Sequence, residues 1–131
     1  MPIAVSFDEL EQIAKTEGMD LFGVADADCF LDENYTGKNP GTFFDNLRSV
    51  VLLGVAIHNG SINPLPGGRA EYTNTLMSAT AFLRVAAYKV ARKIEKAGFE
   101  ASIVPNEGSE FGYWYADKET LLANLSVKWA A

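Results

Sequence analysis

The sequence has few of the residues that bind metals or cross-link a chain. Its 131 residues include one cysteine, Cys29, and one histidine, His58. A single cysteine excludes an intrachain disulfide, and it excludes a cysteine-ligated zinc or iron–sulfur site built from this chain alone. We therefore predict no metal site in this chain. The low cysteine content is typical of a cytoplasmic protein.

Basic residues are also scarce, with 11 Lys and Arg against 17 Asp and Glu, for a net charge of -6. Nucleic-acid-binding domains usually carry a basic face, so nucleic acid is an unfavourable partner for this segment. No apolar run reaches the roughly 18 residues of a membrane span, and no secretory leader pattern is present. We expect a cytoplasmic protein that does not bind membranes.

The length and the 48% hydrophobic content are those of one ordinary globular domain, covering residues 1–131. Ser6 and Glu9 form a capping-box pattern that predicts a helix over residues 6–17, and Gly18 ends it. Short apolar runs at 21–25 and 49–57 predict buried strands.

The second half of the chain predicts a long loop at 58–69, a helix at 74–97 and a strand at 99–104. The order strand, helix, strand predicts a right-handed crossover in which strands 49–57 and 99–104 lie parallel. The predicted fold class is α/β (α+β), with helices packed on a small mixed sheet that contains this parallel βαβ unit.

A last helical pattern begins after Asp117 and places four apolar residues on one face: Leu121, Leu122, Leu125 and Trp129. No Gly, Asn or Pro follows to stop this helix, which indicates either a cut in a longer protein or a helix that frays at a natural end. If the chain is cut there, an exposed apolar face would remain, and we expect the fragment to associate with itself.

Four residues are candidates for cofactor binding. His58 lies at a strand end, where ligands of open α/β sheets tend to bind, although such a histidine is commonly structural. Arg69 follows Pro66-Gly67-Gly68, which could form an anion-binding nest or an ordinary tight turn. Tyr113 and Tyr115 belong to the aromatic run 111–115, whose rings could stack on a planar cofactor, contact another domain, or pack in the core.

Several strings, in this order along the chain, resemble a known family: residues 18–26 (GMDLFGVAD), 48–55 (RSVVLLGV), 96–101 (KAGFEA) and 125–131 (LSVKWAA). They are similar to the first part of iron–sulfur oxidoreductases related to epoxyqueuosine reductase and, more distantly, to corrinoid reductive dehalogenases. In that family a stretch like 125–131 leads into a glycine-rich motif and then a ferredoxin-like segment that binds [4Fe-4S] clusters.

The resemblance implies that this chain is the N-terminal, substrate-pocket or corrinoid-pocket domain of a cytoplasmic redox enzyme. Its partner would be the missing C-terminal ferredoxin-like portion, and [4Fe-4S] clusters and cobalamin would be cofactors of the longer protein. A catalytic Asp of the epoxyqueuosine reductases is absent from the matching stretch 103–107 (IVPNE), so no catalytic residue is assigned. A small, non-enzymatic binding or interaction module is the alternative, since fold alone does not decide function.

Overall fold

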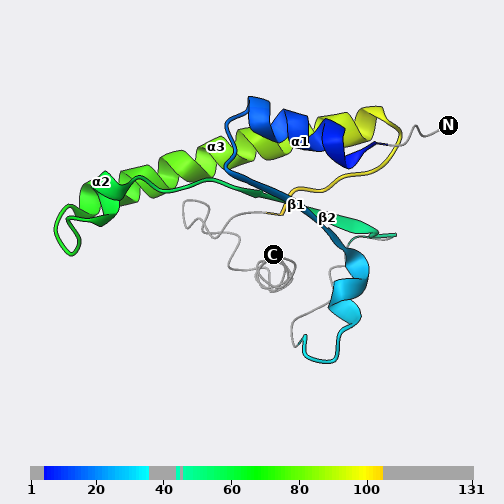
Figure 1. Cartoon of the computed structure of the whole chain (residues 1–131), viewed down its shortest axis with the longest axis horizontal. Helices are drawn as coiled ribbons and strands as arrows, with labels where there is room; N and C mark the ends of the chain where they lie inside the picture. Colours follow the sequence, from blue (N-terminus) through cyan, green and yellow to red (C-terminus); the bar gives the residue numbers. More distant parts are fainter. Residues whose placement is uncertain (1–4, 36–43, 45, 105–131) are drawn as a thin grey trace. The chain divides into compact units, whose positions relative to one another are not determined.

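The computed structural model describes residues 5–35, 44 and 46–104, which form an α+β arrangement. The elements, in chain order, are α1 (Phe7–Thr16), β1 (Leu21–Asp26), the 3-10 helix η1 (Ala27–Leu31), β2 (Ser49–Gly54), α2 (Asn59–Ile62) and α3 (Arg69–Lys96) (Figure 1). The chain divides into two compact units. Unit 1 comprises residues 1–21 and 53–101, and unit 2 comprises residues 22–52 and 102–131.

The N-terminal helix α1 is fixed at both ends by local hydrogen bonds. At its start, Ser6 Oγ accepts from Glu9 N (3.1 Å) and Glu9 Oε2 accepts from Ser6 N (3.0 Å), so the predicted capping box is confirmed. At its end, Gly18 adopts φ +80, Gly18 N donates to Lys15 O, and Met19 N donates to Ala14 O. This pair of bonds is a Schellman motif, which turns the chain sharply toward β1.

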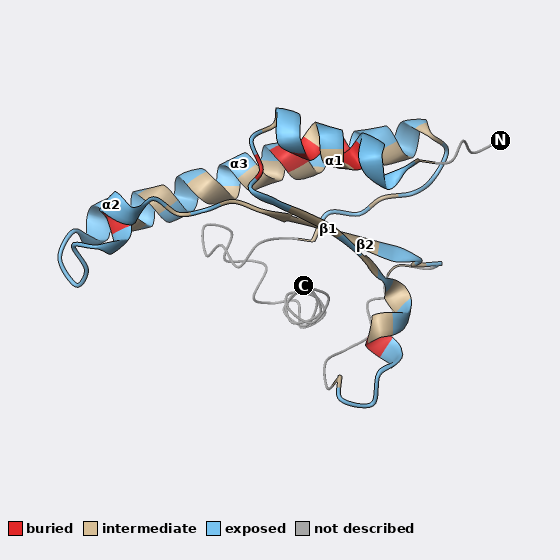
Figure 2. Ribbon diagram, in the orientation of Figure 1, coloured by how far each residue is buried: buried red, intermediate tan, exposed pale blue. Residues whose placement is uncertain are grey.

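Helices α1 and α3 pack against each other and form the core of unit 1 (Figure 1). The buried apolar side chains of this unit are Leu10, Ala14, Met19, Ala86 and Val90 (Figure 2). Small residues on both helices allow a close approach, since Ala14 is 1% exposed and Ala86 is 0% exposed. The Lys89 ammonium donates to Glu17 Oε1 at 2.8 Å and closes one edge of this contact.

Strands β1 and β2 form a two-stranded antiparallel sheet. Asp20 N donates to Gly54 O at one end of the pair and Ala27 N donates to Arg48 O at the other, both at 2.9 Å. The predicted strand at 49–57 is shorter than expected because Ala56 N donates instead to the Asp20 carboxylate, at 2.7 Å. A side chain thus replaces a neighbouring strand at that position.

The predicted strand at 99–104 and the parallel βαβ unit are wrong. Residues 99–104 form no strand, and two of their backbone donors bind the last turns of α3 instead. Phe99 N donates to Ile94 O, and Ala101 N donates to Glu95 Oε1 at 2.8 Å. Within the described residues, the sheet therefore consists of β1 and β2.

Two other boundaries differ from expectation. Helix α3 begins at Arg69 rather than at residue 74, because Gly68 (φ +66) ends the turn and serves as the N-cap. The short helix α2 was expected to be loop. Within the described part of the chain, no helix is long and apolar enough to cross a bilayer. The pattern at 117–131 lies outside the described residues.

Candidate functional site

Two of the predicted cofactor-binding residues, His58 and Arg69, flank the same short segment of unit 1. His58 is the N-cap of α2, Arg69 is the first residue of α3, and α2 contacts α3 (Figure 1). Both residues are exposed. Tyr113 and Tyr115 lie outside the described residues, so only half of the predicted set is placed.

The His58 end of this segment is held by its backbone. His58 O accepts from Ser61 N at 3.1 Å and from Ser61 Oγ at 2.7 Å, and Ser61 is buried, with 6% of its surface exposed. The imidazole makes no capping hydrogen bond to α2. The exposed side chain is therefore carried on a backbone position that these bonds hold.

The Arg69 end is a tight turn that requires glycine. Gly67 N donates to Pro64 O at 2.8 Å, and a methyl group added to Gly67 would lie 3.1 Å from that same oxygen. A methyl group added to Gly68 would lie 3.6 Å from Glu71 Oε2, so a carboxylate lies beside the turn. A negative charge in the first turn of α3 competes with an anion for the amides there. The geometry therefore favours an ordinary tight turn over an anion-binding nest.

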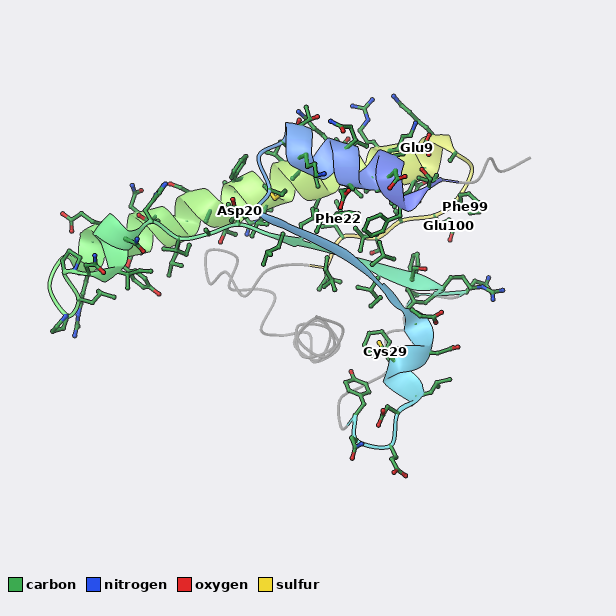
Figure 3. The ribbon with its side chains drawn as sticks, in the orientation of Figure 1. Glu9, Asp20, Phe22, Cys29, Phe99 and Glu100 are labelled. Carbon is green, nitrogen blue, oxygen red and sulfur yellow. The ribbon has the colours of Figure 1, made fainter. Side chains whose placement is uncertain are left out.

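Asp20 fixes the backbone just before this segment, and no motif in the sequence indicated that role. It precedes β1 in the sequence, yet its carboxylate binds Ala56 N, two residues before His58 (Figure 3). Its own N–H donates to Gly54 O, so the residue holds two points at the end of β2. The only signal in the sequence is an acidic residue between a helix-stopping glycine and an apolar run, which many turns share.

Cys29 lies in η1 and is half-buried (Figure 3). Burial raises the pKa of the Cys29 thiol, and the nearby carboxylates of Asp26 and Asp28 raise it further, because both effects disfavour the thiolate. The thiol is consequently a weak nucleophile and a weak metal ligand near neutral pH.

The donor set of the described residues does not suit a metal or a cluster. Within them, no group of three or more His, Cys, Asp or Glu side chains is arranged to hold a metal ion. A cysteine-ligated [4Fe-4S] cluster needs four thiolates, and the chain has one cysteine, whose pKa is raised. Of the four predicted cofactor-binding residues, the described part of the chain includes His58 and Arg69, whose exposed side chains could contact a corrinoid or a substrate.

No protein-family model, curated protein or solved structure matches the chain.

Proposed function

We propose that this chain is the N-terminal pocket domain of a cytoplasmic iron–sulfur oxidoreductase resembling epoxyqueuosine reductase. It contributes scaffold and pocket wall, while [4Fe-4S] clusters are held by a separate ferredoxin-like portion. Cobalamin is the second cofactor that the resemblance implies for the longer protein. The isolated chain is inactive as a reductase.

One observation carries this proposal. Two of the strings that resemble the family, at 18–26 and 48–55, form the paired strands of the sheet and the turn that enters it. The backbone N–H of Asp20, in the first string, donates to the backbone oxygen of Gly54, in the second. The two strings therefore belong to one structural element, as the resemblance implies, and this supports the proposal.

Within this proposal, His58 and Arg69 are the residues whose side chains contact the ligand in the pocket. An imidazole can donate to or accept from a polar group, and a guanidinium can pair with a phosphate or carboxylate. Tyr113 and Tyr115 remain proposed stacking residues. Because the chain's thiol does not suit a cluster, electrons would reach the pocket from the ferredoxin-like portion.

The test uses the product of the complete reading frame that encodes this chain. Iron and acid-labile sulfide are quantified, and hydroxocobalamin is titrated while the visible spectrum is recorded. The proposal expects bound iron and a spectral shift, with binding weakened about tenfold by His58→Ala and by Arg69→Ala, the loss of roughly one good polar contact. Asn59→Ala, an exposed neighbour of His58, should leave binding unchanged.

A full-length product with neither iron nor cobalamin binding would reject the reductase function. Turnover by the isolated 131-residue chain with a chemical reductant would reject the claim that it is only a pocket domain. The second candidate is a non-enzymatic interaction module, and an exposed apolar side of α3 favours it: Met77, Val85 and Tyr88 are 53%, 51% and 59% exposed.

A further inference from the structure

Helix α3 has an exposed apolar side that we call the α3 stripe. Its members are Met77, Ala81, Val85 and Tyr88, all exposed and spaced by four, four and three residues, which places them on one side of the helix. The buried residues Ala86 and Val90, on the side that faces α1, are not part of it. Figure 2 shows exposed surface along α3 on either side of the buried positions. An exposed apolar row of this kind is typical of an interaction surface.

The α3 stripe is bordered by positive charge. The guanidinium of Arg92, one turn beyond Tyr88, lies 5.9 Å from the centre of the Tyr88 ring and is held there by a cation–π contact. The whole helix carries six basic and two acidic residues in a chain whose net charge is -6. Tyr, Met and Arg are enriched in protein–protein interfaces. The α3 stripe is therefore complementary to an apolar group surrounded by carboxylates.

The chain itself presents such a group on η1, which we call the η1 knob and define as Asp28, Leu31 and Asp32. Leu31 is 72% exposed, and Asp28 lies three residues before it, on the same side of a 3-10 helix. Asp32 follows directly, and its Oδ1 accepts from Asn34 N at 2.8 Å, which fixes the carboxylate. Residues 22–35 contain four acidic residues and no basic residue.

We propose that this chain associates with a second copy of itself, with the η1 knob of one copy docked on the α3 stripe of the next. Leu31 contacts the apolar row and Asp28 pairs with Arg92. The two surfaces differ, so the contact is head-to-tail and each copy can engage two neighbours. The area that one side of one helix can bury is smaller than the roughly 800 Å² per partner of a standard stable interface, so the association is weak. It is sensitive to salt because it includes an exposed charge pair. This inference does not depend on the proposed function.

The experiment is a charge swap followed by sedimentation velocity over a wide concentration range, at low and high salt. Arg92→Glu disables the α3 stripe but leaves the η1 knob intact, and Asp28→Arg does the reverse. Each variant alone should associate at least about tenfold more weakly than the original chain, because like charges then face each other. An equimolar mixture of the two variants should recover association, since each supplies the surface that the other lacks.

Two controls separate this contact from other causes. Lys15→Glu changes the net charge as Arg92→Glu does but lies on α1, and it should leave association unchanged. Leu31→Ser removes the apolar part of the η1 knob without a charge change. It should also weaken association, and it tests the knob independently of any effect of Asp28→Arg on the η1 fold. A chain that is monomeric at all concentrations overturns the proposal, as do variants that associate normally and a mixture that fails to recover.

Discussion

Replacing Gly18 by alanine should destabilise unit 1, because the turn after α1 needs a residue without a side chain. Gly18 has φ +80 and its N–H belongs to the Schellman motif that ends the helix. The left-handed conformation costs an alanine roughly 1–2 kcal/mol, while its reduced freedom in the unfolded chain offsets about 0.4–1 kcal/mol. The backbone effect alone is therefore a modest net loss.

The side chain of Phe82 adds to this loss. A methyl group on Gly18 would lie 3.0 Å from Phe82 Cζ, closer than ordinary carbon atoms approach, so the ring has to move. The ring is 41% exposed and can shift outward, which limits this part of the cost. We expect a total loss of about 1–2 kcal/mol in the free energy of unfolding.

Urea unfolding followed by circular dichroism measures the effect, with Gly60→Ala as the matched control. Gly60 lies within α2, has no positive φ, and has no atom within 4 Å of an added methyl group. The same chemical change there should be neutral or stabilising by up to about 1 kcal/mol, because alanine favours the helix. The same substitution should thus lower stability at Gly18 but not at Gly60.

Gly18→Asn separates the two causes, since asparagine tolerates the left-handed region but still carries a Cβ atom facing Phe82. It should lie between the original chain and Gly18→Ala. If Gly18→Ala is as stable as the original chain, or if Gly60→Ala is destabilised equally, the assignment of this turn is wrong.

Four further predictions concern α1 and η1. Leu10→Ala should lower the unfolding free energy by about 2–5 kcal/mol in urea titrations, since Leu10 is 6% exposed in the contact with α3. Ser6→Ala should cost about 1 kcal/mol through loss of the N-cap. The backbone N–H of Ser6 holds the pKa of Glu9 below its ordinary value. The stabilisation of α1 by the Glu9 carboxylate is therefore present above the ordinary carboxyl pKa and is lost as pH falls through the lower pKa of the folded state. Glu9→Gln should flatten this acid dependence of α1 helicity, and an unchanged profile would contradict the assignment. Iodoacetamide should modify Cys29 more slowly than free cysteine at the same pH, and Asp26→Asn should speed the reaction.

Local signals predicted the parts of the fold that local hydrogen bonds determine. The pattern at 6–17 gave α1 as Phe7–Thr16, because the capping box and the terminating glycine act within a few residues of the helix. The run at 21–25 likewise predicted β1 at Leu21–Asp26, although the strand is not buried as expected, since Leu21 is 72% exposed. In both cases the information lies next to the element that it specifies.

The strand predictions at 49–57 and 99–104 failed where a side chain, in one case distant in the sequence, accepts a hydrogen bond from a backbone N–H. Asp20 shortens β2 from 36 residues away in the sequence, and the Glu95 carboxylate takes the Ala101 N–H that a strand would need. Hydrophobic patterns contain no information about such bonds. For the candidate site, the turn signals predicted one loop at 58–69 and missed the helix α2 at Asn59–Ile62; they also could not show that His58 and Arg69 are exposed or that Glu71 lies beside the turn.

The bond between Asp20 and Gly54 has a consequence for protein engineering. Both residues belong to unit 1, and the 2.9 Å contact between Asp20 N and Gly54 O brings the two flanks of residues 22–52 within one strand spacing of each other. The chain therefore leaves unit 1 after Leu21 and returns to it at Leu53 from neighbouring positions. A short hairpin turn could replace residues 22–52, and another small domain with adjacent termini could be grafted there, while the pairing of α1 with α3 is retained.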